Sequence, residues 1–198
     1  MKKLSTYLFL FLFSFSAPSF ADDIQDFEIE GISIGDSLLD HLSKEEIITE
    51  IESNKPTYNY LTDEFGEVYI FRNFETYKKL SFYVKQNDKN YKIYFVRGII
   101  DYDDNIEKCY TKQKEIAEEV SSFFKNTKKE ESDFKFPWDP TGKSHIFHMK
   151  FIFDSGNQIN ISCSEYEKSL KIKNNWLDGL SVAIITKEVQ NWLENHIN

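Results

Sequence analysis

Three stretches of the chain carry apolar residues at helical spacing. The longest covers residues 105–126, where apolar positions recur at steps of three and four with one polar gap at Gln113. This period predicts a helix with one buried face. Asp104 is the expected cap of this helix. The two shorter stretches are 44–53, where Ser43 and Glu46 predict a capping box, and 187–196, which follows Thr186 as its expected cap.

Six other segments either alternate between apolar and polar residues or form short apolar runs, and both patterns are typical of strands. They are residues 67–72, 79–85, 91–102, 144–154, 157–165 and 180–186. The residues at 154–157 (Asp-Ser-Gly-Asn) predict a tight hairpin turn. A connection this short joins two neighbouring antiparallel strands. The charged stretch 127–143 is expected to be a turn-rich connection.

The predicted order is therefore helix, three strands, helix, three strands, helix, or α-βββ-α-βββ-α. We expect an α+β protein with mainly antiparallel sheet and helices packed on one face. The 177 residues from 22 to 198 suit a single domain with a sizeable core.

The first 21 residues predict a signal peptide that is not part of this domain. Lys2 and Lys3 precede an almost purely apolar run over residues 8–15, Pro18 follows, and Ala21 completes a small-residue cleavage pattern. An uncleaved membrane anchor is the alternative, but the run is short for a bilayer core of about 30 Å. We expect cleavage after Ala21 and a periplasmic or secreted protein.

The net charge restricts the partners of this protein. The whole chain has a formal charge of −9, and removing a signal with two lysines and no acid would make it −11. Such a chain is unsuited to nucleic acid, whose phosphates need clustered lysine and arginine. It is equally unsuited to anionic membrane surfaces. An unidentified protein or a small ligand remains as the expected partner.

Two cysteines are present, and the predicted elements place both in the core. Cys109 lies on the apolar stripe of the long helix, and Cys163 shares one strand face with Ile159 and Ile161. In an oxidising compartment this arrangement predicts a Cys109–Cys163 disulfide. The alternative is a free or redox-active thiol, although the chain has no Cys-x-x-Cys motif.

No metal site is predicted. His145 and His148 lie on a predicted strand, where an odd separation sends side chains to opposite faces. Residues 101–105 resemble the start of a calcium-binding loop, but the sixth and twelfth positions are Ile106 and Lys112 instead of glycine and glutamate.

No catalytic residue or cofactor site is predicted either. The glycine-containing segment 31–36 lacks the third glycine of a nucleotide-binding loop, and no Gly-x-Ser-x-Gly motif occurs. A hydrolase whose site is assembled from scattered residues remains an alternative.

Aromatic residues provide the only indication of a binding surface. Tyr83, Tyr94 and Tyr102 alternate out of phase with the apolar residues of their strands, so they are candidates to line the second face of a sheet. Trp138 lies between two prolines as a candidate exposed contact. Such rings suit a sugar, a peptide or an apolar ligand. The alternative is that loops and helices cover both sheet faces.

Four segments carry a resemblance to a known group of proteins. They are residues 27–39, the helix around Cys109, the strand segment 160–163 and the turn 176–180. Together they resemble small secreted proteins of unassigned function from AT-rich marine bacteria, a group that implies no activity or catalytic residues. We therefore expect an exported, soluble, non-catalytic binding or accessory protein of the cell envelope. The alternatives are the hydrolase and a small-ligand binder that uses the tyrosine-lined sheet face.

Overall fold

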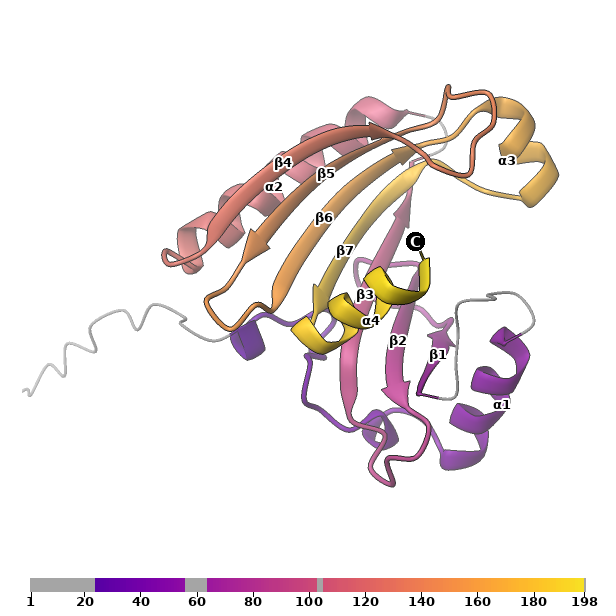
Figure 1. The fold of residues 1–198 in the computed structure, drawn as a ribbon, viewed down its shortest axis with the longest axis vertical. Coiled ribbons are helices and arrows are strands. Elements are labelled where there is room, and N and C mark those ends of the chain that lie inside the picture. The colour runs from indigo at the N-terminus through magenta and orange to yellow at the C-terminus, as the bar shows by residue number, and fades with distance from the viewer. Residues whose placement is uncertain (1–23, 56–63, 103–104, 198) are drawn as a thin grey trace, which may run out of the picture.

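The computed structural model describes residues 24–55, 64–102 and 105–197 and contains one seven-stranded sheet (Figure 1). The strands are β1 (Phe65–Ile70), β2 (Lys79–Lys85), β3 (Ile93–Asp101), β4 (Lys128–Lys135), β5 (His145–Ile152), β6 (Gln158–Glu165) and β7 (Gly179–Ile185). The α-helices are α1 (Lys44–Asn54), α2 (Ile106–Phe123), α3 (Lys168–Asn174) and α4 (Lys187–Ile197), and the two 3₁₀ turns are Ile24–Asp26 and Leu38–Asp40. The α+β class is confirmed.

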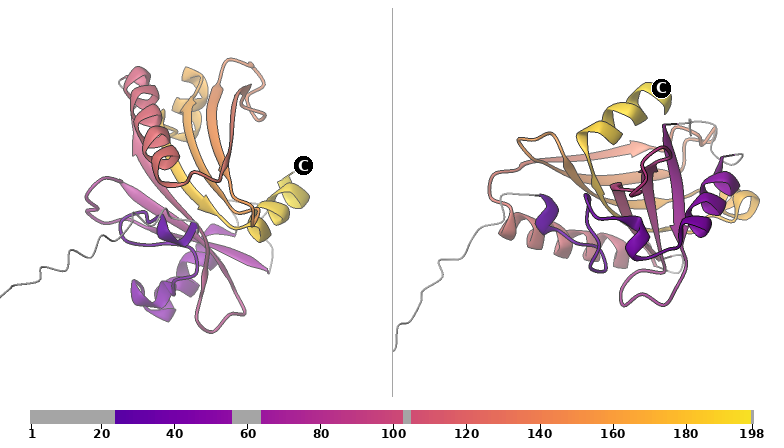
Figure 2. Two further views of the ribbon diagram at one scale, coloured as in Figure 1. Left: turned by 90° about the vertical axis from the view of Figure 1, so that its left-hand side faces the viewer. Right: turned by 90° about the horizontal axis from the view of Figure 1, so that it is seen from below.

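The strand order is β1-β2-β3-β7-β6-β5-β4, and every neighbouring pair is antiparallel. The last strand, β7, therefore lies in the middle and joins β1–β3 to β4–β6. Helices α1 and α2 lie on one side of the sheet, which we call the outer face. Helix α4 lies on the other side, which we call the inner face (Figures 1 and 2).

The larger core lies between the outer face and helices α1 and α2. The apolar stripe of α2 buries Cys109, Ala117 and Val120 against β6 and β7. Cys109 and Cys163 form a disulfide with a Cα–Cα distance of 6.0 Å, which confirms the predicted pairing. The bond joins the first half of α2 to the middle of the sheet.

The polar gap in the α2 stripe has a structural reason. Gln113 is fully buried, and its Nε2 donates to the carbonyl oxygens of Phe147 at 2.9 Å and Ile161 at 2.8 Å. These carbonyls belong to β5 and β6. Because a buried polar group is costly without partners, the amide must face the strands, and it fixes the height of α2 above them.

A second, smaller core lies on the inner face. Val189 and Trp192 of α4 pack against an apolar group on β1, β2, β3 and β7, namely Phe65, Tyr83, Phe95, Ala183 and Ile185. We expected the helices to share one face, and α1 and α2 do so. Helix α4 differs because it buries the large apolar residues that these strands place on the inner face.

Two elements were absent from the predicted order. All eight residues of β4 are exposed, and this edge strand is mostly charged, so no apolar alternation marks it. Charges on an edge strand also disfavour pairing with another chain. Helix α3 has seven residues and none is buried, so it too lacks an apolar stripe.

The helix caps follow local sequence closely. Ser43 and Glu46 form the predicted capping box at the start of α1. Asp104, the expected cap of α2, lies outside the described residues, and Asn105 accepts the hydrogen bond from the backbone N–H of Glu107 at 3.1 Å. Residues 1–21 and the predicted cleavage after Ala21 also lie outside the described residues. Among the helices that are described, none has the length and apolar character needed to cross a bilayer.

Candidate functional site

Of the three tyrosines expected to line one sheet face, Tyr83 and Tyr94 lie in the same inner-face cluster and Tyr102 does not. Tyr83 is buried under α4, where it stacks on Phe95 with ring centroids 4.6 Å apart. Tyr94 is partly buried against Phe65, and Tyr102 packs on the outer-face core. A register irregularity between Tyr83 and Val84 breaks the alternation on which the prediction depended.

Trp138 is 60% exposed and contacts the edge of Phe136 at 5.2 Å. Its role as a binding contact stays a prediction.

The two histidines of β5 project from opposite faces of the strand. The Nδ1 atom of His145 lies 3.4 Å from Asp133. Burial lowers the pKa of His148 to about 4, and the charge of Lys150 adds to this effect. Across residues 24–55, 64–102 and 105–197, no three histidine, cysteine, aspartate or glutamate side chains are grouped as a metal site.

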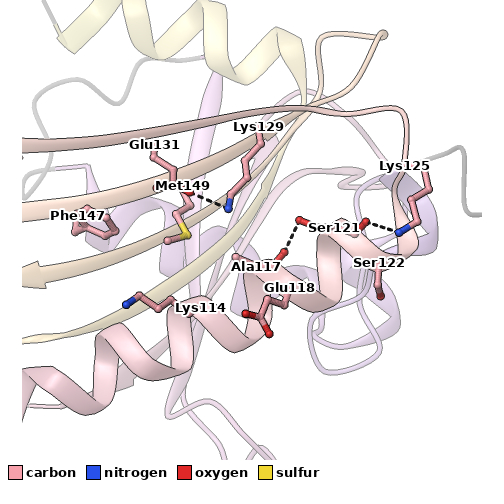
Figure 3. A pocket seen from close by; sticks show the side chains of 10 residues that line it. All are labelled: Lys114, Ala117, Glu118, Ser121, Ser122, Lys125, Lys129, Glu131, Phe147 and Met149. Carbon is pink, nitrogen blue, oxygen red and sulfur yellow. Dashed lines mark hydrogen bonds and ion pairs between the residues drawn. The ribbon is translucent and has the colours of Figure 1, made fainter.

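One depression, which we call the outer groove, lies between α2 and strands β4 and β5 (Figure 3). Its volume is about 410 Å³, and Ala117, Phe147 and Met149 supply its apolar surface. Charged side chains form the rim, and several are already engaged: Lys129 pairs with Glu131 at 2.8 Å. Lys125 donates to the carbonyl of Ser121 at 3.1 Å. The outer groove is thus an apolar trough with a partly neutralised rim.

A larger depression, of about 520 Å³, opens on the inner face, and we call it the inner cleft. Alternate residues of three adjacent strands form one side of it, because Tyr69 lies opposite Ser81 and Ser81 lies opposite Arg97. Lys79 and Ile99, a second directly opposed pair, extend this surface. The sheet register thereby places two cations and an aromatic ring on the same side.

The segment between β6 and β7 forms the other side of the inner cleft. Tyr166 follows β6, and α3 is capped by Asn175, whose left-handed backbone (φ 54°) reverses the chain. Trp176 is thereby turned back toward the sheet, and its backbone N–H donates to the carbonyl oxygen of Lys171 at 3.1 Å. Asp178 holds the segment in place because it accepts from the backbone N–H of Tyr166 and pairs with Lys171.

Aromatic rings face the inner cleft from both sides. Tyr69 and Phe71 stack at 6.0 Å, and Tyr166 and Trp176 meet at 5.0 Å. Phe136 supports the second pair from behind, with its ring 5.5 Å from that of Trp176. Phe71 is 70% exposed, so the opening of the cleft presents apolar surface to solvent.

Arg97 lies at the base of the inner cleft in a polar network. Its Nε donates to Ser81 at 3.1 Å, and its Nη2 lies 3.3 Å from Oε1 of Glu67 and 3.4 Å from the hydroxyl of Tyr69. Glu67 is fully buried, and its Oε2 has no hydrogen-bond partner among the described residues. Burial raises the pKa of Glu67, while the charge of Arg97 opposes that rise.

Sequence reasoning missed Arg97, Glu67, Lys79 and Trp176. The sequence did contain a signal for two of them, because Glu67 is the one charge of β1 and Arg97 is the one charge inside β3, which ends at Asp101. A charge in such a position needs a partner on the same sheet face. Which strand supplies the partner depends on the register.

Comparison of the chain with protein-family models, with curated proteins and with solved structures finds no match. The function is therefore argued from the fold and the inner cleft.

Proposed function

We propose that this protein is an exported, non-catalytic binding protein that holds a small ligand in the inner cleft. The observation that carries this proposal is the pair of aromatic walls, one from β1 and one from the segment before β7, on two sides of the same cleft. Exposed rings in a concave site favour ligands with a flat apolar part. The volume of about 520 Å³ suits a small molecule.

Binding is favoured over hydrolysis by the state of the inner-face histidine. His148 lies opposite Ser162 on β6, but its buried Nε2 has no hydrogen-bond partner among the described residues. A histidine activates a serine through a hydrogen bond. His148 therefore gives the hydrolase no support.

Removing one aromatic wall tests the location of the site. Trp176→Ala is expected to weaken binding of the fluorescent probe N-phenyl-1-naphthylamine about tenfold, because the probe loses a stacking surface. Trp138→Ala, which removes an exposed tryptophan outside the inner cleft, serves as the matched control and is expected to leave binding unchanged. The measurement is a fluorescence titration of each variant. If only Trp138→Ala weakens binding, the inner cleft is not the binding site, and the surface around Trp138 is supported instead.

Export requires its own test. Support comes from the disulfide, which persists in oxidising compartments. When the full chain is produced in a bacterium with a secretory pathway, we expect intact mass spectrometry of the periplasmic or medium fraction to find a protein that begins at Asp22. A full-length chain recovered from the membrane fraction would instead support the uncleaved anchor.

A further inference from the structure

Two cations lie side by side on the inner face. Lys79 is opposite Ile99, and Arg97 is two residues before Ile99 on the same strand, so the two cations are diagonal neighbours. Diagonal neighbours across antiparallel strands are about 7–8 Å apart, which is within reach of long side chains. Burial and the charge of Arg97 lower the pKa of Lys79, and the charges of Asp101 and Glu67 oppose this lowering only in part. A further negative group between the two cations would therefore be stabilised.

The carboxylates at the inner cleft leave one positive charge in excess among the described residues, because Arg97 pairs with Glu67 and Lys78 pairs with Asp101. Lys78 pairs with Asp101 at 2.9 Å, and Asp101 is the only carboxylate among the residues that line the cleft. The ammonium of Lys79 lies over the Tyr69 ring, 5.7 Å from its centroid, and is not paired with a carboxylate among the described residues. In a chain with a net charge of −9, this is a local site of the opposite sign.

Glu67 lies beside the cleft on the same sheet face, because it is two residues before Tyr69 on β1. Its carboxyl group is fully buried and contacts the Nη2 of Arg97 through one oxygen, while the other oxygen has no hydrogen-bond partner among the described residues. Arg97 also contacts Ser81 and Tyr69, so its guanidinium is fixed in one position. A fixed guanidinium loses less entropy on binding an anion than a mobile one.

We infer that the ligand of the inner cleft is an organic anion, with its negative group between Lys79 and Arg97 and its apolar body against Tyr69 and Trp176. This inference rests on the proposed function, because it assigns a ligand class to the same site. Carboxylates, sulfonates and phosphates share the required chemistry, since each accepts charge-assisted hydrogen bonds from lysine and arginine.

A pair of probes that differ by one anionic group tests the inference. 8-Anilinonaphthalene-1-sulfonate has the ring system of N-phenyl-1-naphthylamine and adds a sulfonate. We expect the wild-type protein to bind the sulfonate at least about tenfold more tightly at low salt. Lys79→Met keeps the apolar stem and removes the charge, so it should weaken sulfonate binding about tenfold and leave the neutral probe within about twofold.

The matched control is Lys114→Met, which removes the same charge from the rim of the outer groove (Figure 3). It should change the binding of neither probe, and circular dichroism melting should show that both variants are folded. Equal binding of the two probes, or equal weakening of both by Lys79→Met, would show that the ligand need not be an anion. The inner cleft would remain the proposed binding site. If Trp176→Ala leaves the affinities for both probes unchanged, the inner cleft is not the binding site, and the inference about an anionic ligand is contradicted as well.

Discussion

The double variant Cys109→Ala/Cys163→Ala is expected to unfold with a free energy about 4 kcal/mol below that of the oxidised wild type. The disulfide spans a sequence separation of 54 residues, so it removes many extended conformations from the unfolded chain. Both sulfurs lie in the core, where the shorter side chains also lose packing. A loss this large is a substantial fraction of the roughly 5–15 kcal/mol by which a typical domain is stable.

Chemical denaturation of the two proteins, followed by far-ultraviolet circular dichroism, measures this difference. Wild-type protein in excess reductant is the control for the packing contribution, because it loses the bond and keeps the sulfur atoms. We expect its midpoint to fall between those of the double variant and the oxidised protein. Equal midpoints for all three would show that α2 is held to the sheet without the bond.

The second large effect is expected for Arg97→Met, which should lower the free energy of unfolding by about 3 kcal/mol near neutral pH. The variant keeps an apolar stem and removes the cation next to Glu67. Because Glu67 has no exposed surface, its carboxylate would be left buried without its ion-pair partner, and Lys79 would supply only a more distant positive charge. Loss of one partner from a buried ion pair costs far more than loss of a surface pair.

This effect should depend on pH in a definite direction. Burial already raises the pKa of Glu67 above its ordinary value, and loss of the Arg97 charge should raise that pKa further. The folded variant then holds a proton that the unfolded chain releases, so stability falls as pH rises from the ordinary glutamate pKa through the raised one. We therefore expect a smaller loss at about pH 5 than at about pH 8.

A second substitution separates the charge from the packing. Glu67→Gln/Arg97→Met removes both charges, and it should recover much of the stability lost at about pH 8 and abolish the extra pH dependence. Denaturation curves at the two pH values provide the comparison. A loss that is equal at both values, with no recovery in the double variant, would mean that Arg97 acts through packing alone.

Local sequence patterns predicted the helices and strands that have one buried face, because burial of one face places apolar residues at regular intervals in the sequence. The stripe of α2, the capping box at Ser43 and the alternation of β6 each depend on near neighbours in the chain. The disulfide followed from the same patterns, because each cysteine shares a face with apolar residues. Strand β4 and helix α3 were missed because neither has a buried face to mark its period.

The inner cleft required information that no local pattern contains. Tyr69, Lys79 and Arg97 come from three strands, and only the pairing of β1 with β2 and of β2 with β3 places them together. The tyrosine prediction shows the same limit, because Tyr83 and Tyr94 share the inner-face cluster while Tyr102 packs on the outer-face core. A shift of one residue sends a side chain to the opposite face.

The sequence by itself determined the class of fold, most of its helices and strands, and the identity of the two bonded cysteines, because burial leaves a period in the chain. Only the tertiary structure decided that β7 lies in the middle of the sheet, that α4 covers the inner face and that Arg97 contacts Glu67. Those outcomes depend on how distant strands align, and alignment is a property of the assembled sheet.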